Sequence, residues 1–325
     1  MRCLLLLPLI GVSFVTGCTQ AIADKILIPA HSAERTEWMN QRRHEYGTRL
    51  GDRLKEFNYD SFDNVRIDAL MLYPEKTPRG VVVILHGLTD RKESMLSIAE
   101  AFADAGYLAV TPDLRAHGES GGRYTSLGYR EKRDMVALLD YLDAQGIDVS
   151  HTAVLGGSLG AAVAIQWAGI DPRIKAIVAV APFAELRTEM EYFYKTYNIS
   201  PLKQFVVEIA AQMEGHFNID HVSPLATIKT IDTPLLLAHG RQDEIVPITE
   251  SQRLFEAAKG PVALQEVDGQ HMNIREALGR RFLRRAIDWV DTYVATDSHP
   301  QSPSAWIGLL PNRNFPASTP LTMKP

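Results

Sequence analysis

Ser158 lies in a stretch of the chain whose composition suits nucleophilic catalysis. It stands within "VLGGSLGAAV", where an apolar run gives way to an alanine-rich one. The stretch fits the pattern G-x-S-x-G, in which glycines let a strand turn abruptly into a helix and leave the serine hydroxyl in the open. A free hydroxyl is a weak nucleophile, so this interpretation requires a base and an acid elsewhere in the chain.

His271 is the best candidate for the base. It lies in "VDGQHMN", directly after the last strand of the regular pattern, where a loop would return over the edge of a sheet. His239 is less suitable, because it stands inside the apolar run "LLLAHG" and a histidine there fits packing. The other histidines downstream of the serine belong to an irregular region or to the tail: His216, His221 and His299.

Asp243 is the candidate for the acid. It stands in "HGRQDEIVP", a polar turn that follows an apolar run. A carboxylate there could orient the imidazole of His271 and stabilise its protonated form. Glu244 is adjacent but would point differently, and Asp268 precedes the histidine too closely. The order Ser158, Asp243, His271 therefore predicts a catalytic triad.

Two backbone amides are the candidates for an oxyanion hole. The N–H of Leu159 follows the nucleophile and begins a helix, whose N-terminus favours negative charge. The second is expected from the N–H of Leu88 in "ILHGLTD", the loop after the first long apolar run. His86 and Gly87 would shape that loop. A metal is not predicted there, because His86 has no partner ligands nearby in the sequence.

Strands that alternate with helices are expected to position these residues. Continuous apolar runs such as "GVVVILHG" and "IKAIVAVAP" are typical of strands buried on both faces. The pattern predicts an α/β fold with a mostly parallel, doubly wound sheet and a helical cap inserted after the sixth strand. Each candidate catalytic residue follows the carboxyl end of a predicted strand, where such sheets bind ligands.

The predicted organisation has four parts. Residues 1–17 are expected to be a signal peptide and residues 18–60 a tether with peripheral helices. The catalytic domain would occupy residues 61–296, with the cap at residues 183–232. The proline-rich tail, residues 297–325, is patternless and is expected to be disordered.

The N-terminal stretch predicts export from the cytoplasm. Arg2 precedes "CLLLLPLIGVSFV", which has the layout of a secretory signal. The following "VTGC" resembles the lipobox of bacterial lipoproteins. The resemblance implies cleavage before Cys18, a diacylglyceryl group on its sulfur and anchoring in the bacterial cell envelope, at the outer membrane or periplasm of a Gram-negative cell. A plain secretory signal with an incidental cysteine is the alternative.

The composition of the chain limits the classes of partner and cofactor that it is expected to bind. The chain has 325 residues, a formal charge of −5 and no basic block, which argues against nucleic acid. Its two cysteines, Cys3 and Cys18, lie in or directly after the signal. The mature domain would therefore hold no disulfide, zinc ribbon or thiol nucleophile. No cofactor is expected.

The ordered motifs "LHG", "DLRAHGESGG", "GGSLG", "HGRQDEIVP" and "DGQH" together resemble the α/β-hydrolases over roughly residues 62–294. The group most similar is that of esterases, lipases and serine-aminopeptidase-like hydrolases, including relatives of monoglyceride lipases and cinnamoyl esterases. An HGGG loop, typical of some lipases, is absent because Leu88 and Thr89 follow His86-Gly87. The resemblance implies hydrolysis of carboxylic esters through an acyl-enzyme on Ser158, without a cofactor.

Other functions fit the same residues. A serine aminopeptidase would share the triad, and cap acids could bind a substrate amine: Glu185, Glu189 and Glu191. Acidic residues are also favoured near a helix start, which explains them without a ligand. A thioesterase would differ only in its preferred substrate. A catalytically inactive binding or scaffold lipoprotein would keep the fold alone, and it would need none of the predicted triad.

Overall fold

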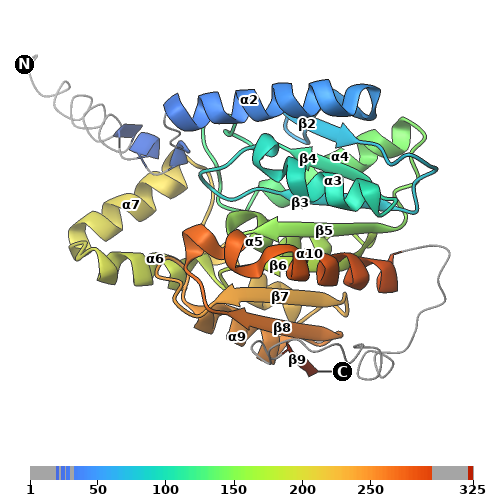
Figure 1. Ribbon diagram of the computed structural model, residues 1–325. Helices are drawn as coiled ribbons and strands as arrows, with labels where there is room; N and C mark the ends of the chain where they lie inside the picture. Colours follow the sequence, from blue (N-terminus) through green and yellow to red (C-terminus); the bar gives the residue numbers. More distant parts are fainter. Residues whose placement is uncertain (1–19, 22, 26, 30–32, 295–320, 325) are drawn as a thin grey trace, which may run out of the picture.

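A nine-stranded sheet forms the centre of the molecule (Figure 1). The computed structural model describes residues 20–21, 23–25, 27–29, 33–294 and 321–324. The strand order is β1-β2-β4-β3-β5-β6-β7-β8-β9. The strands are β1 Leu54–Asp60, β2 Arg66–Leu72, β3 Val81–Leu85, β4 Leu108–Pro112, β5 Thr152–Gly157, β6 Ile174–Val180, β7 Leu235–Gly240, β8 Val262–Val267 and β9 Leu321–Lys324.

The middle of the sheet is parallel and buried on both faces. Strands β3 to β8 pair in parallel, whereas β1, β2 and β9 join by antiparallel pairing. In β3, the side chains of Val81, Val83 and Leu85 enter one core and those of Val82 and Ile84 enter the other. This alternation confirms the prediction from continuous apolar runs, because side chains on both sides of the strand leave water.

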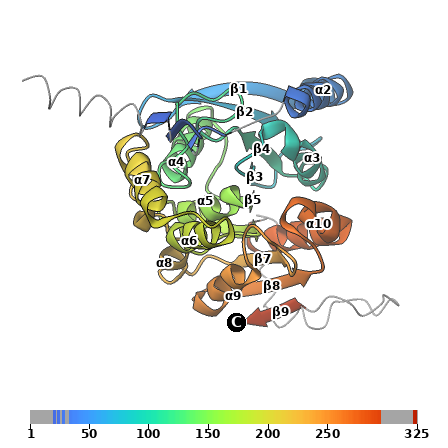
Figure 2. The ribbon, with the colours of Figure 1, turned by 90° about the vertical axis from the view of Figure 1, so that its left-hand side faces the viewer.

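Helices cover the two faces of the sheet. The apolar cores place α4, α5, α8 and α9 on one face and α3 and α10 on the other (Figure 2). The covering helices are α3 Leu96–Asp104, α4 Glu131–Ala144, α5 Leu159–Ala168, α8 Pro224–Ile228, α9 Ile248–Ala257 and α10 Ile274–Tyr293. Short 3-10 turns complete the connections: η1 Gly51–Arg53, η2 Lys92–Met95, η3 Ile219–His221 and η4 His271–Asn273.

The chain changes direction within the sheet between β3 and β5. After β3 the chain adds β4 on one side, and it then adds β5 on the other side of β3. Leu85 at the end of β3 pairs with Gly156 near the end of β5. The loops that leave these two strands are therefore neighbours, and a doubly wound sheet offers its binding crevice at such a point.

A pair of helices projects from the carboxyl edge of the parallel strands (Figure 1). Helices α6 (Leu186–Thr196) and α7 (Pro201–Met213) follow β6, the sixth strand, as the fold-class prediction requires. Pro201 at the first turn of α7 suits a helix start, because its missing N–H would have had no acceptor there. We refer to α6 and α7 together as the cap.

Two strands differ from the sequence predictions. Residues 18–60 were expected to contain only a tether and helices, and helix α2 (Ala33–Leu50) lies there, but residues 54–60 form β1. Pairing with β2 and stacking of Phe57 and Tyr59 on Tyr141 outweigh the helix-like spacing. Residues 321–324 of the supposedly patternless tail form β9.

The predictions for the signal peptide, Cys18 and most of the tail concern residues outside the described ones. Among the helices that the structure does describe, none combines the length and apolar composition needed to cross a bilayer.

Candidate active site

Ser158 occupies a sharp turn between β5 and α5. Its backbone angles are φ 53° and ψ −118°, a region that side-chain-bearing residues rarely adopt. A Cβ added to Gly156 would lie 2.3 Å from the carbonyl of Gly160, and one added to Gly160 would lie 2.5 Å from the carbonyl of Leu85. These two glycines therefore permit the close approach of strand, helix and neighbouring loop, as expected from the sequence.

The side chains of Ser158, His271 and Asp243 lie in line. The Ser158 Oγ is 3.0 Å from His271 Nε2, and His271 Nδ1 is 2.7 Å from Asp243 Oδ2. An ionised carboxylate only accepts hydrogen bonds, so Nδ1 carries the proton and Nε2 is left to accept the serine proton. This arrangement can remove the proton from Ser158 as its oxygen attacks a carbonyl carbon.

Asp243 is held as an anion by several donors. Its Oδ1 accepts hydrogen bonds from the amides of Ile245 and Val246, at 3.0 and 2.8 Å. Burial alone would raise the pKa of this carboxyl group. Hydrogen bonds from His239 and His271 outweigh burial and hold the pKa well below its ordinary value. The acid therefore stays charged throughout the neutral range.

His239 contributes to the site in a way that the sequence did not indicate. Its side chain is fully buried, as packing would require. Its Nε2 also lies 2.9 Å from the Val246 carbonyl and 3.3 Å from Asp243 Oδ2, and Nδ1 lies 2.7 Å from Ser251 Oγ. The histidine thus fixes the turn that carries the acid. Its spacing of four residues before Asp243 was the available sequence signal.

The loop after β3 lies beside the serine. A Cβ added to Gly87 would be 3.5 Å from the Ser158 Cβ. The carbonyl of Leu88 accepts a hydrogen bond of 2.8 Å from His117 Nε2. This bond fixes the peptide group between Leu88 and Thr89. The amide of Leu159 opens α5, where first-turn N–H groups have no acceptor within the helix. Both predicted oxyanion donors therefore belong to elements that border the nucleophile.

His86 connects two loops at the same sheet edge. Its Nδ1 donates to the Gly87 carbonyl at 2.8 Å, and its Nε2 accepts from the Leu114 amide at 2.9 Å. Burial and the neighbouring His117 lower the pKa of His86 to about 4, so the ring is neutral at pH 7. Both ring nitrogens are engaged by the chain. Among the described residues, no three His, Cys, Asp or Glu side chains gather as metal ligands.

Glu189 on the first turn of α6 brings an acid close to this site. Burial, and then the charges of Glu250 and Asp243, raise the pKa of Glu189 to about 8. Arg253 forms ion pairs with Glu185 and Glu250. Within the described part of the chain, Glu189 Oε2 has no hydrogen-bond partner. Of the cap acids singled out in the sequence, Glu189 is therefore the one that combines burial with a carboxyl oxygen left unpaired by the described residues.

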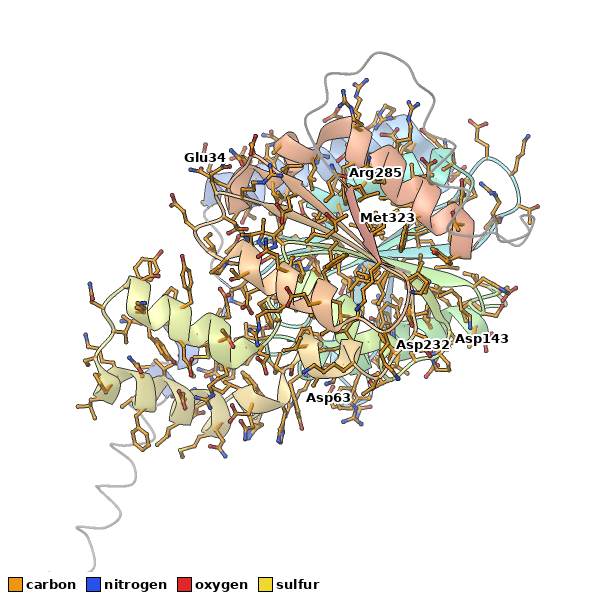
Figure 3. The ribbon with its side chains drawn as sticks, turned by 90° about the horizontal axis from the view of Figure 1, so that it is seen from below. Glu34, Asp63, Asp143, Asp232, Arg285 and Met323 are labelled. Carbon is orange, nitrogen blue, oxygen red and sulfur yellow. The ribbon has the colours of Figure 1, made fainter. Side chains whose placement is uncertain are left out.

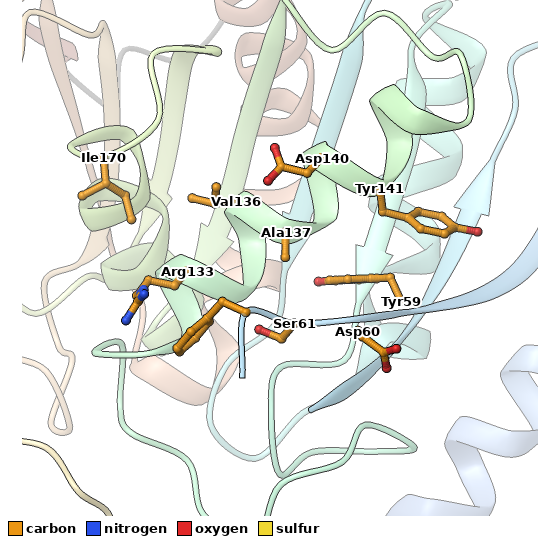
Figure 4. A pocket seen from close by; sticks show the side chains of 10 residues that line it. Tyr59, Asp60, Ser61, Arg133, Val136, Ala137, Asp140, Tyr141 and Ile170 are labelled. Atoms are coloured by element: carbon orange, nitrogen blue, oxygen red, sulfur yellow. The ribbon is translucent and has the colours of Figure 1, made fainter. Parts of the chain in front are cut away.

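A groove elsewhere on the molecule holds none of the predicted site residues. It has a volume of about 490 Å³ and runs along α4 (Figure 4). Its lining combines three rings with polar and aliphatic side chains: Tyr59, Asp60, Ser61, Phe62, Arg133, Val136, Ala137, Asp140, Tyr141 and Ile170. The chemistry described above is separate from it.

The sheet, the serine turn and the cap after the sixth strand define an α/β-hydrolase. Residues 76–224 match the family described as serine aminopeptidase, S33. The chain belongs to this family of hydrolases.

Relatives in this family include esterases and lipases. The chain is 31% identical to the uncharacterised protein YqkD of Bacillus subtilis over 207 residues, 61% of this chain and 66% of YqkD. It is 27% identical to the esterase YjfP of Escherichia coli, over 59% of this chain and 80% of the esterase. The Pyrococcus furiosus esterase Pf2001 superposes with a TM-score of 0.63 at 26% identity, covering 76% of this chain and 95% of that structure.

Proposed function

We propose that the protein is a serine hydrolase that cleaves carboxylic esters through an acyl-enzyme. The observation that carries the proposal is the continuous contact from Ser158 Oγ through His271 to Asp243, at 3.0 and 2.7 Å. A scaffold that only binds has no need of this arrangement. Relatives described as esterases support an ester as the substrate.

Each proton has a place in the reaction. The Ser158 Oγ bonds to the ester carbonyl carbon as its proton passes to His271 Nε2, and the carbonyl oxygen becomes an oxyanion. The amides of Leu159 and Leu88 donate hydrogen bonds to that oxyanion. The intermediate collapses, and the leaving alkoxide takes the proton from His271. Water then attacks the acyl group with the same histidine as base, which releases the acid and restores Ser158.

Fluorophosphonate labelling followed by intact-mass measurement tests the nucleophile. The wild-type protein should gain one adduct, and folded Ser158→Ala should gain none. Ser150→Ala is the matched control, since Ser150 is an exposed serine on a distant loop, and it should label fully. A folded wild type that takes no adduct would contradict the proposal. A panel of acyl esters, acyl thioesters and aminoacyl amides then defines the substrate.

A serine aminopeptidase is the second candidate, and Glu189 is the observation that favours it. A carboxyl oxygen without a partner near the triad can accept a hydrogen bond from a substrate ammonium group. The ammonium would also favour the charged form of Glu189. Faster hydrolysis of aminoacyl amides than of simple esters, with the amide activity lost in Glu189→Gln, would support the aminopeptidase.

We also propose that a lipid on Cys18 anchors the protein in the bacterial cell envelope. The support is the sequence "VTGC" after an apolar stretch. The wild-type chain should incorporate labelled palmitate, and its mature N-terminus should carry diacylglyceryl. Cys18→Ser should abolish incorporation, whereas Cys3→Ser should still be labelled. Labelling that persists in Cys18→Ser would contradict the anchor.

A further inference from the structure

The cap exposes an unusual number of large apolar side chains. Five of them have exposed fractions between 46% and 74%, and we call them the cap surface: Phe193, Tyr197, Leu202, Phe205 and Met213. Their exposure shows that they face solvent. Figure 3 shows α6 and α7 projecting from the rest of the molecule with side chains directed outward.

These side chains lie on both helices, with one group at the end of α6 and the other along one face of α7. Phe193 and Tyr197 are four residues apart on α6, and their ring centroids are 4.6 Å apart. Leu202, Phe205 and Met213 are three and eight residues apart on α7, a spacing that lies on one face of a helix. The group on α7 therefore follows the length of that helix, about 20 Å at 1.5 Å per residue.

The far end of α7 lies beside the N-terminal segment. Leu27 is buried, and its Cδ1 would be 2.9 Å from a Cβ on Gly215, just after α7. Ile28 next to it is 40% exposed. Cys18 precedes Gln20, the first described residue, by two positions. The chain between them spans at most about 7 Å, so a lipid on Cys18 would be tethered close to Gln20.

The charges where α6 meets α7 suit an anionic surface. From Tyr192 to Val207 the sequence holds two lysines, Lys195 and Lys203, between Glu191 and Glu208. Glu208 is paired with Arg187. Both lysines are exposed and alternate with the apolar side chains. Lysines can extend their ammonium groups to phosphates while their stems and the neighbouring apolar groups contact acyl chains. Aromatic rings are favoured at the same depth of a bilayer.

We propose that the cap surface docks on a phospholipid bilayer with anionic headgroups, with α7 lying along the membrane. The inference rests on the proposed lipid at Cys18, because that lipid would determine which side of the molecule faces the bilayer. The exposed apolar side chains, the two lysines and the position of the N-terminal segment all fit this occupant.

Depth-dependent fluorescence quenching tests the proposal on the full chain. The protein is reconstituted in vesicles that contain phosphatidylglycerol and brominated phosphatidylcholine. Tryptophan is introduced by Phe205→Trp or Leu202→Trp on the cap surface. Ile170→Trp is the matched control, because Ile170 is 48% exposed but follows α5 at the amino edge of the strands. The emission of the four native tryptophans is subtracted with the wild type.

Brominated lipid should quench the two cap tryptophans by about twofold and leave the control unchanged. Lys195→Glu combined with Lys203→Glu should reduce quenching in anionic vesicles but not in neutral ones. Absence of quenching at saturating vesicle concentration overturns the proposal. Emission that depends on protein concentration and not on bromine also overturns it, because a second copy of the chain then covers the surface.

Two further readouts separate this proposal from those it builds on. Vesicle flotation reports the anchor, and fluorophosphonate labelling reports the nucleophile. A chain that floats and labels without quenched cap tryptophans refutes docking alone. A chain whose cap tryptophans are quenched but which does not label supports docking and refutes the proposed hydrolase. Quenching of the cap tryptophans in a chain that incorporates no palmitate supports docking without the lipid.

Discussion

Asp243 lies between two histidines, and this position decides what its replacement does. Its carboxylate accepts from His271 at 2.7 Å and lies 3.3 Å from His239 Nε2. Both contacts favour the charged form, and two backbone amides secure the other oxygen. The acid is thus a fixed acceptor that selects which nitrogen of His271 carries the proton.

Asp243→Asn should reduce kcat for an ester by about 10³–10⁴-fold, because an amide can stabilise the wrong tautomer of His271 and cannot stabilise its protonated form. Steady-state hydrolysis of a p-nitrophenyl ester measures the change. Glu244→Gln is the neighbouring control and should keep kcat within about twofold, since the Glu244 side chain is exposed. Equal losses in both variants would remove the assigned role of Asp243.

Glu189 predicts a dependence of stability on pH. Its pKa is raised to about 8 in the folded protein, above an unfolded value near 4.3. Between these values the folded chain holds a proton that the unfolded chain has lost, so this group lowers stability as pH rises. The free energy of unfolding of Glu189→Gln should therefore exceed that of the wild type by on the order of 2 kcal/mol at pH 9. The two values should converge near pH 4.

Urea unfolding at pH 4 and pH 9 measures this difference in the free energy of unfolding. Glu191→Gln is the control, because Glu191 is exposed on the same helix. It should show no comparable change between the two pH values. A constant difference between Glu189→Gln and the wild type at both pH values would contradict the buried-acid explanation.

Some residues of the site could be predicted from the sequence, and others could be identified only in the structure. The positions of Ser158, Asp243 and His271 could be predicted because a glycine pattern and chain order restrict the choices. Glu189 could not be distinguished from Glu185 and Glu191 in the same way. Only the structure shows that Arg253 pairs with Glu185, and that Glu189 lies close enough to Asp243 for the charge of Asp243 to raise its pKa.

At the scale of elements, the β5–α5 turn depends on two glycines and tolerates change at a third. A Cβ at Gly160 would meet the Leu85 carbonyl at 2.5 Å and the His86 carbonyl at 2.6 Å. Backbone atoms cannot move aside as a flexible side chain can. A Cβ at Gly157 would meet no atom within 4 Å. Alanine substitutions at Gly160 and Gly157 therefore form a matched pair for testing the turn.

Gly160→Ala should destabilise the protein by about 3 kcal/mol or more, because strand β3 and helix α5 would have to separate. Gly157→Ala should change stability by no more than about 0.5 kcal/mol. Chemical denaturation of both variants gives the comparison. Similar stabilities for the two would show that close packing at Gly160 is not needed.

Elements with a strong apolar period could be predicted, and those defined by pairing could not. The runs that became β3, β6 and β7 are apolar enough to indicate buried strands from sequence. β1 carries charged and aromatic residues, and it is a strand because β2 supplies its hydrogen bonds and Tyr141 stacks on it. β9 depends in the same way on the free edge of β8.

At the scale of the whole molecule, β9 closes one edge of the sheet. Leu321–Lys324 pairs antiparallel with β8, from Leu321 opposite Gln265 to Lys324 opposite Val262. An open strand edge offers unpaired N–H and C=O groups to other chains. The C-terminal residues therefore protect the sheet although they lie far from the site in sequence.

Removal of residues 321–325 should lower the Tm by several degrees and cause association that increases with protein concentration. Calorimetry and light scattering measure the two effects. Met323→Ala is the control, because it keeps the backbone pairing and changes a side chain that is 38% exposed. A truncated protein that stays monomeric with an unchanged Tm would show that β8 needs no cover.

The strained backbone of Ser158 lowers the stability of the whole fold, although the same residue carries the hydroxyl that nucleophilic attack would require. A residue held at φ 53° and ψ −118° costs on the order of 1–3 kcal/mol, comparable to a sizeable part of a protein's net stability. Glycine relieves such strain, but it has no hydroxyl. Selection for heat resistance alone would therefore drift toward an inactive protein, and any search for robust variants must screen for turnover at the same time.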